Sequence, residues 1–346
     1  MNMKISLEND ACHVTIESFG GAITGFHLKD AAQVNPLSFA FTAEQMPQNN
    51  KNGAPYRGHF LCAGRWGLPS EGEIKKGLPN HGEAANIEWQ TAKNNHNVSM
   101  QVTAKKEGLH IERTIELDTH NAVIAVSECF TNINPLGKLY NVVQHPTLAA
   151  PFLNTATIVN CNATIGFDQV NYLDAVKNSL QFPQVKDNNG NSFNLKNPQE
   201  KYNSVFSFVV NGNSNIGWLT AYSPVHNVLL GYVWKRSDYP WIHLWQHWNE
   251  NEMLYRGIEF GTAGIHQPFA EILNTATELF GEKTFAYIDA GEKVCKQYLA
   301  FMYKTGNDFT ETESITVAAN RIEIKTKENN IIKLATSISL INELQG

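Results

Sequence analysis

Residues 98–130, VSMQVTAKKEGLHIERTIELDTHNAVIAVSECF, contain the patterns that decide the fold. Apolar and polar residues alternate over residues 98–104, and the same period of two returns over residues 109–117. Because successive side chains of a strand point to opposite faces, each run predicts a strand with one buried and one solvated face. Residues 122–130 are apolar on both faces, so we expect a central strand that is covered on both sides.

Similar runs elsewhere predict further strands, and turn-forming segments separate them. These strands are expected at Cys12–Glu17, Ser204–Val210, Ile216–Tyr222, Val228–Lys235, Trp241–Trp248, Leu254–Gly261 and Gln297–Lys304. Helical periodicity is scarce, and only residues 274–280 suggest a helical turn or two. Many strands with few helices predict an all-β protein built as a large antiparallel β-sandwich.

The chain is expected to have one main domain and a small extension. All-β domains of this size often remain single, so residues 1–305 are assigned to the sandwich. Residues 306–346 differ in composition and are expected to form a C-terminal appendix that contains strands and packs on the main domain. Within it, residues 315–317 and 322–325 are expected to pair with residues 331–334.

The composition argues against several classes of partner. The formal net charge is -6 and the pI is about 6.1, with no run of lysine and arginine that could bind nucleic acid. An anionic membrane surface is disfavoured for the same reason, and no stretch approaches the length of a membrane span. We expect no nucleic-acid or membrane partner, and a monomer or weak homodimer.

The N-terminus and the cysteines bear on the compartment. Residues 1–11, MNMKISLENDA, carry charges and no apolar stretch of signal-peptide length. The five cysteines are scattered without a CxxC pair, which favours buried free thiols in a reducing compartment. The sequence therefore predicts a cytoplasmic protein.

Two histidines lie where an imidazole could act on a bound molecule. His81 lies in residues 78–86, LPNHGEAAN, whose Pro, Asn and Gly predict a turn, although a lone loop histidine is more often simply solvated. His145 precedes Pro146, where a strand should end or bulge, and an imidazole at a strand end is well placed for proton transfer. A histidine at the core edge, bonded to a carbonyl, is an equally good interpretation of His145.

Glu259 is a candidate general base. It lies in residues 255–262, YRGIEFGT, where the apolar neighbours on either side of it should point into the core. Gly257 and Gly261 share its face and clear space around the carboxylate, and glycine within a strand often marks the close approach of a ligand or backbone. An ordinary exposed glutamate is the alternative, and the glycine pair makes it less attractive because glycine weakens a strand.

The segment WIHLWQHW, residues 241–248, supplies candidate binding side chains. On a strand, Trp241, His243, Trp245 and His247 share one face, and Gln246 lies on the other. Indole rings stack on apolar C–H faces of sugars while histidine and glutamine bond hydroxyls, so these are candidate substrate-binding residues. A tryptophan-rich core strand is at least as good an interpretation for half of them.

A metal site is the weaker interpretation of these histidines. His243 and His247 could chelate a metal with Glu259 or His266. However, the order HLWQH lacks the HExxH signature, so no metal is predicted.

Together these segments resemble the aldose 1-epimerase superfamily, and they are most similar to its hexose-6-phosphate mutarotase branch. Five segments resemble motifs of that branch and occur in the same order: Arg57-Gly58 with CAGRWG at 62–67, LPNHGEAANIEW at 78–89, Gln144-His145-Pro146, residues 257–262, and DAGE at 289–292. The resemblance covers roughly residues 1–305 and implies the galactose mutarotase-like supersandwich, with that domain as the catalytic one.

The resemblance also implies an activity in carbohydrate metabolism. The expected isomerase interconverts the α and β anomers of a hexose by ring opening and closure, without a cofactor. Glu259 would take the proton of the anomeric hydroxyl while His145 protonates the ring oxygen. His81 and Arg57 would orient the small-molecule sugar, which is the expected partner.

Departures from the branch narrow the substrate. Ala85 stands where the branch has an arginine, and Glu83 replaces an aromatic residue. Losing a cation and gaining an anion beside a phosphate site argues against a sugar phosphate. Arg57 and Arg65 remain as possible donors to an anion or to hydroxyls, and Phe260 replaces the proline that follows the catalytic glutamate.

Two other functions remain consistent with the sequence. One is a non-catalytic carbohydrate-binding protein on the same sandwich, in which the acid–base pair is idle. The other is a different sugar isomerase or a lyase, which would need a further base or a metal. Fold-level analogy does not choose among them.

Overall fold

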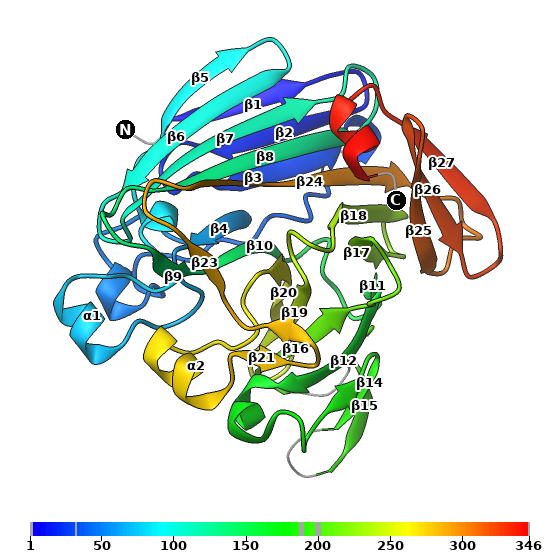
Figure 1. The fold of residues 1–346 in the computed structure, drawn as a ribbon. Coiled ribbons are helices and arrows are strands. Elements are labelled where there is room, and N and C mark those ends of the chain that lie inside the picture. The colour runs from blue at the N-terminus through cyan, green and yellow to red at the C-terminus, as the bar shows by residue number, and fades with distance from the viewer. Residues whose placement is uncertain (1–2, 32, 187–189, 198–201, 345–346) are drawn as a thin grey trace.

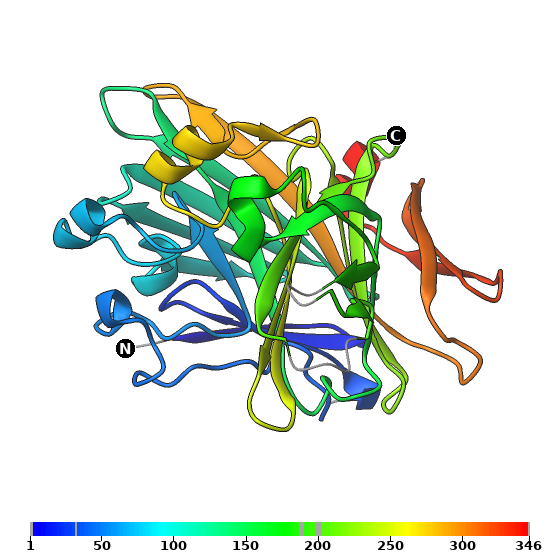
Figure 2. The same ribbon diagram turned by 90° about the horizontal axis from the view of Figure 1, so that it is seen from below.

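The computed structural model describes residues 3–31, 33–186, 190–197 and 202–344. Two large sheets, of 12 and 8 strands, pack face to face as a β-sandwich (Figures 1 and 2). Neighbouring strands in both sheets run antiparallel, as the alternating patterns predict. In the part of the chain that the structure describes, no helix has the length and apolar character needed to span a bilayer.

Both large sheets bring together strands that are distant in the sequence. In order across the sheet, the 12-stranded sheet contains β1 (Lys4–Glu8), β2 (Cys12–Glu17), β3 (Ile23–Leu28), β4 (His59–Ala63), β10 (Val142–Leu148), β20 (Met253–Gly261), β19 (Trp241–Trp248), β16 (Ser204–Val210), β12 (Ala163–Asp168), β13 (Leu180–Gln181), β14 (Gln184–Lys186) and β15 (Ser192–Asn194). The 8-stranded sheet contains, likewise in order, β11 (Ile158–Cys161), β17 (Ile216–Ser223), β18 (Val228–Lys235), β24 (Lys293–Lys304), β8 (Val123–Asn132), β7 (Leu109–Leu117), β6 (Asn97–Ala104) and β5 (Gln90–Asn94).

Smaller elements surround the sandwich. The short strands are β9 (Lys138–Tyr140), β21 (Glu278–Leu279), β22 (Glu282–Lys283) and β23 (Ala286–Ile288), and the C-terminal sheet contains β25 (Thr312–Ala318), β26 (Arg321–Thr326) and β27 (Ile331–Ala335). The α-helices are α1 (Glu71–Lys75) and α2 (Phe269–Thr275), and the 3₁₀ helices are η1 (Lys29–Ala31), η2 (Gln48–Asn50), η3 (Ala84–Asn86), η4 (Gln169–Asp174) and η5 (Ser339–Leu344).

The predicted strands of residues 98–130 are confirmed as the neighbours β6, β7 and β8. In β7 the residues at 109, 111, 113, 115 and 117 are buried, and their neighbours are half-buried or exposed. The first half of β8 is covered on both faces, because Val123 and Ala125 pack against apolar residues of the C-terminal segment. Ser127 and Cys129 in its second half are half-buried, so the expected coverage on both sides holds only for the first half.

The C-terminal segment forms its own three-stranded sheet beside the sandwich (Figure 1). The pairing of β26 with β27 across residues 327–330 is the one that the sequence predicts. The expected pairing of residues 315–317 with residues 331–334 is wrong, because β25 pairs with β26, which lies between β25 and β27. Ile322 and Ile324 of β26, with Ile341 of η5, bury apolar side chains against the outer face of the 8-stranded sheet. This burial explains why every residue of β17 is buried.

The structure corrects two local predictions. Residues 274–280 are not a helical unit: α2 ends at Thr275 and β21 follows, and the helix begins directly after Pro268. The strand β10 neither ends nor bulges at Pro146, because its register with β20 is the same on both sides of that residue. The pairing with β20 skips His145 and Pro146 and resumes at Thr147, so a missing N–H at Pro146 is tolerated.

The cysteine prediction is correct for Cys12, Cys62 and Cys161, which are buried free thiols. It is wrong for Cys129 and Cys295, which form a disulfide. The two residues are direct cross-strand partners in β8 and β24, an adjacency that 166 residues of sequence separation conceals. A disulfide of this kind persists in oxidising compartments, so it does not fit the reducing compartment that the scattered cysteines suggested.

Candidate active site

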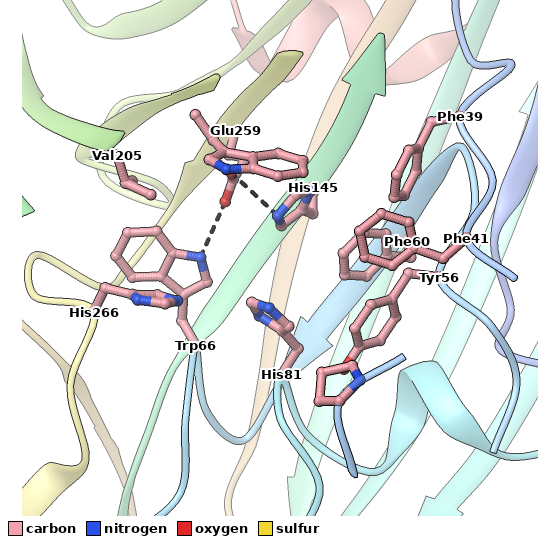
Figure 3. Close-up of a pocket in the computed structure, with 12 residues that line it drawn as sticks. Phe39, Phe41, Tyr56, Phe60, Trp66, His81, His145, Val205, Glu259 and His266 are labelled. Carbon is pink, nitrogen blue, oxygen red and sulfur yellow. Dashed lines mark hydrogen bonds and ion pairs between the residues drawn. The ribbon is translucent and has the colours of Figure 1, made fainter. Parts of the chain in front are cut away.

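A cavity of about 220 Å³ lies over the centre of the 12-stranded sheet, where β10, β20 and β19 are neighbours. It is lined by Phe39, Phe41, Pro47, Tyr56, Phe60, Trp66, His81, His145, Val205, Trp245, Glu259 and His266. Glu259, His145, Trp66 and His81 gather on one side, and the phenylalanines with Tyr56 gather on the other (Figure 3). The cavity therefore has a titratable end and an aromatic end.

Adjacent strands bring Glu259 and His145 together. The β10–β20 register pairs Gln144 with Phe260, so the next residues on each strand, His145 and Glu259, face each other. His145 Nε2 lies 3.2 Å from Glu259 Oε1. The other ring nitrogen, Nδ1, lies 2.9 Å from the Thr147 hydroxyl, which fixes the ring orientation. The ring also stacks on Phe60, with 4.2 Å between centroids.

Burial favours the neutral form of both groups. Glu259 is 1% exposed, and burial raises its pKa to about 8, although a hydrogen bond from Trp66 Nε1 at 3.0 Å opposes the rise. Burial also lowers the pKa of His145 well below its ordinary 6.5. The pair therefore holds one proton near neutral pH, in a position to be shared between Oε1 and Nε2.

The two glycines near Glu259, Gly257 and Gly261, are required for different structural reasons. A Cβ at Gly257 would lie 2.7 Å from Glu259 Oε1 and would displace the carboxylate. A Cβ at Gly261 would lie 2.5 Å from the side chain of Val143 in β10. Gly257 thus clears the carboxylate as the sequence predicts, and Gly261 allows the close approach of β10.

His81 reaches the cavity from a strained turn. Its φ of 59° is in the left-handed region, which few non-glycine residues adopt. Its Nδ1 accepts a hydrogen bond from the Gly67 N–H at 3.3 Å, so the proton of the neutral ring is on Nε2. Burial, with His266 nearby, lowers the pKa of His81 to about 3. His81 is therefore a neutral donor rather than a proton carrier at neutral pH.

Most of the aromatic wall was not predicted from the sequence. Phe39, Phe41, Tyr56 and Phe60 come from β4 and the irregular segment before it, where no periodic pattern signals a shared face. Trp66 lies between two glycines with positive φ, Gly64 and Gly67, and that glycine pair is a signal that could have identified it. His266 follows β20 in a loop, and its sequence context carries no such signal.

Both predicted arginines lie outside the cavity lining. Arg57 forms an ion pair with Glu17 at 3.3 Å. Arg65 is buried between Glu73 and Glu107, each 2.9 Å away, and ties α1 to the sandwich. Each guanidinium is thus ion-paired with a carboxylate outside the cavity, so neither arginine lies where we expected it to hold the substrate.

Of the five candidates in β19, only Trp245 lines the cavity. Trp241 donates through Nε1 to the Lys283 carbonyl at 2.7 Å, and the Gln246 amide donates to the Tyr202 carbonyl. His247 stacks on Tyr255 toward the end of the strand. Trp241 and Gln246 are core residues, as the alternative interpretation of this strand proposed.

His243 lies behind the cavity. Its ring packs against Trp66 with 4.0 Å between centroids, and its Nδ1 lies 2.7 Å from the Ser207 hydroxyl. It therefore supports the indole that bonds Glu259. Over the described ranges, no three His, Cys, Asp or Glu side chains are grouped as metal ligands.

The sequence matches no family model and no curated protein. The fold is similar to solved structures. One is a galactose mutarotase-like protein from Lactobacillus casei ATCC 334, with a TM-score of 0.58 and 14% identity over 87% of this chain and 100% of that one. A galactose mutarotase related enzyme from Lactobacillus acidophilus gives 0.56 and 12% over 89% and 100%. A galactose mutarotase-like protein from Clostridium acetobutylicum gives 0.53 and 14% over 87% and 95%.

These likenesses define the class of fold. The protein is a galactose mutarotase-like β-sandwich, as the sequence resemblance implied. At 12–14% identity the comparison establishes the architecture alone.

Proposed function

We propose that the protein is an aldose 1-epimerase-like isomerase that interconverts the α and β anomers of an unphosphorylated sugar. The observation that carries the proposal is the contact between Glu259 Oε1 and His145 Nε2, 3.2 Å apart in the wall of a cavity. Mutarotation needs one base and one acid at neighbouring oxygens, and this pair holds the single proton that such a cycle requires.

The cycle uses the shared proton. When His145 holds it, the Glu259 carboxylate takes the proton of the anomeric hydroxyl and His145 protonates the ring oxygen. The C1–O5 bond breaks and an aldehyde forms. Rotation about C1–C2 presents the other face of the aldehyde. On closure the O5 hydroxyl gives its proton to His145 and Glu259 gives its proton to the new anomeric oxygen, so the pair ends in the state in which it began. His81 Nε2–H is a further donor for a sugar oxygen, and Trp66 steadies the carboxylate.

The cavity lining favours a sugar without a phosphate. Neither arginine nor lysine lines the cavity among the described residues, so a phosphate dianion would meet no cation. Ala85 is buried, and the Glu83 carboxylate accepts from the backbone N–H of Lys106, so neither replaces the branch's arginine. These features support the proposal of an unphosphorylated substrate. The aromatic end suits the C–H face of a sugar ring.

Polarimetry tests the proposal directly. Freshly dissolved α-D-glucose and α-D-galactose should reach anomeric equilibrium faster with the protein than in buffer. The protein should accelerate the mutarotation of glucose 6-phosphate much less. Binding of either sugar in calorimetry without acceleration would show a carbohydrate-binding protein instead. If these sugars are neither bound nor interconverted faster than in buffer, the proposal is contradicted.

The rate should depend on pH through the proton shared by Glu259 and His145. Because burial raises the pKa of Glu259 to about 8, kcat/KM should fall above about pH 8 as the pair loses that proton. Because the pKa of His145 is lowered well below 6.5, the decrease of kcat/KM on the acid side should begin only well below pH 6.5. A rate that keeps rising with pH through the alkaline range would contradict the one-proton pair.

The variant Trp66→Phe tests whether the deprotonation of Glu259 causes the decrease of kcat/KM above about pH 8. The indole N–H stabilises the charged carboxylate, so removing it should raise the pKa of Glu259 further and move the fall to higher pH. Trp218→Phe, on the other sheet, should leave the fall in place.

A further inference from the structure

A second cavity, of about 290 Å³, lies beside the turn that joins β19 to β20, the strand that carries Glu259. Its lining includes Arg256 on β20 and Trp248 at the end of β19. Arg256 precedes Glu259 by three residues, so its side chain is on the opposite face of the sheet. The segment after β10 supplies Leu153 and Thr157. This cavity is therefore separate from the candidate active site.

Arg256 is a buried cation that no carboxylate of the described residues neutralises. It is 1% exposed, and no ion pair joins it to an acidic group within the described ranges. Nη1 donates to the Lys196 carbonyl at 3.0 Å and Nη2 to the Leu195 carbonyl, but Nε donates to no group in the part of the chain that the structure describes. Burial lowers the pKa of Arg256 to about 9.

Among the described residues, the charged and titratable neighbours do not supply a compensating anion: Glu252, in the lining of the same cavity, is exposed and forms no ion pair with Arg256. Cys161 lies nearby, but burial raises the pKa of its thiol to about 12, so the thiol is neutral. The Lys196 ammonium is a further cation and is already paired with Glu311 at 2.5 Å. Burying a charge without a partner is costly, so an anion in the adjacent cavity would be strongly favoured.

The free donors and the lining indicate which anion fits. Trp248 Nε1 is buried and, like Arg256 Nε, bonds to no other group in the described part of the chain. Two N–H donors match the two oxygens of a carboxylate in number. Leu153, Met253 and Leu254 provide apolar contacts for the rest of such a molecule. A single cation, with the exposed carboxylate of Glu252 also in the lining, favours a monoanion over a phosphate dianion.

We propose that this cavity binds a small organic carboxylate with an apolar body, through Arg256 and Trp248. The site does not depend on the proposed sugar chemistry, because Arg256 and Glu259 lie on opposite faces of β20.

Calorimetric titration of the full chain with hexanoate and with hexanamide tests the proposal. Hexanamide has the same apolar chain and no charge, so it should bind at least about tenfold more weakly than hexanoate. Arg256→Met should weaken hexanoate binding at least about tenfold, and Trp248→Phe, which keeps the ring and loses the N–H, should weaken it severalfold. Arg321→Met, at a half-buried arginine of β26, should bind as the wild type does.

Circular dichroism checks that each variant folds. If Arg256→Met does not fold, Trp248→Phe and the hexanamide comparison decide the question. The proposal is overturned if hexanoate does not bind the wild type, if hexanamide binds equally well, or if inorganic phosphate binds more tightly than hexanoate.

Discussion

Replacing Glu259 with glutamine should reduce the acceleration of sugar mutarotation by about 10²–10⁴-fold. The amide has the size of the carboxyl group but cannot exchange a proton with His145 Nε2, which lies 3.2 Å away. The cycle therefore loses its base while the cavity keeps its shape. Initial rates of optical rotation, on freshly dissolved α-D-glucose or whichever sugar the wild type turns over fastest, measure the effect.

The Glu259→Gln variant should fold as well as the wild type. Its amide oxygen can still accept the Trp66 N–H, and the change removes an ionisable group from a fully buried position. The matched control is Glu112→Gln, an exposed glutamate of β7 on the other sheet, which should keep full activity. Full activity in Glu259→Gln would exclude the carboxylate as the base.

The sandwich could be predicted because the burial of one strand face is a local property of the sequence. The runs at residues 98–104 and 109–117 predict β6 and β7 correctly, since alternation needs no knowledge of the partner strand. The Cys129–Cys295 bond could not be found this way, because it depends on the pairing of β8 with β24. The order of strands across a sheet is a long-range property.

A site residue could be predicted from the sequence where the residues that explain its position are close to it in the chain. Gly257 is required because a Cβ there would meet the Glu259 carboxylate, and that cause lies two residues away. Arg57 and Arg65 were predicted as site residues only because arginine can bind anions and hydroxyls. Their partners Glu17 and Glu107 are about 40 residues away in the chain. No short pattern reveals such a pair.

Two charged residues interrupt the apolar faces of the strands formed by residues 98–130. Arg113 and Glu128 occupy the core-facing positions of β7 and β8, where the patterns are otherwise apolar. Arg113 Nε donates to Glu128 Oε1 at 2.7 Å, and Gln144 Nε2 donates to the other carboxylate oxygen. Gln144 directly precedes His145 in β10. A buried ion pair of one sheet thus holds the strand of the other sheet that carries the candidate acid.

Replacing Arg113 with methionine should lower the free energy of unfolding by about 3–5 kcal/mol, because it leaves the Glu128 carboxylate buried without a cation. Both side chains are almost fully buried, at 3% and 0% exposure, so solvent screens the pair little. The substitution also removes the donor to the Gly21 carbonyl and the guanidinium over the Trp89 ring. Urea denaturation followed by tryptophan fluorescence measures the loss.

A second substitution separates the charge from the packing. Arg113→Met combined with Glu128→Leu should recover much of the lost stability, since replacing both partners of a buried pair with apolar groups is often neutral. Lys293→Met, which breaks the half-exposed pair with Glu112 on the outer face of the same sheet, should cost no more than about 1 kcal/mol. If Arg113→Met destabilises the protein no more than Lys293→Met does, the ion pair does not hold the two sheets together. If the double variant keeps the stability but loses mutarotation rate, the network serves to position β10, because Gln144 then loses its Glu128 acceptor and keeps only the Tyr239 hydroxyl.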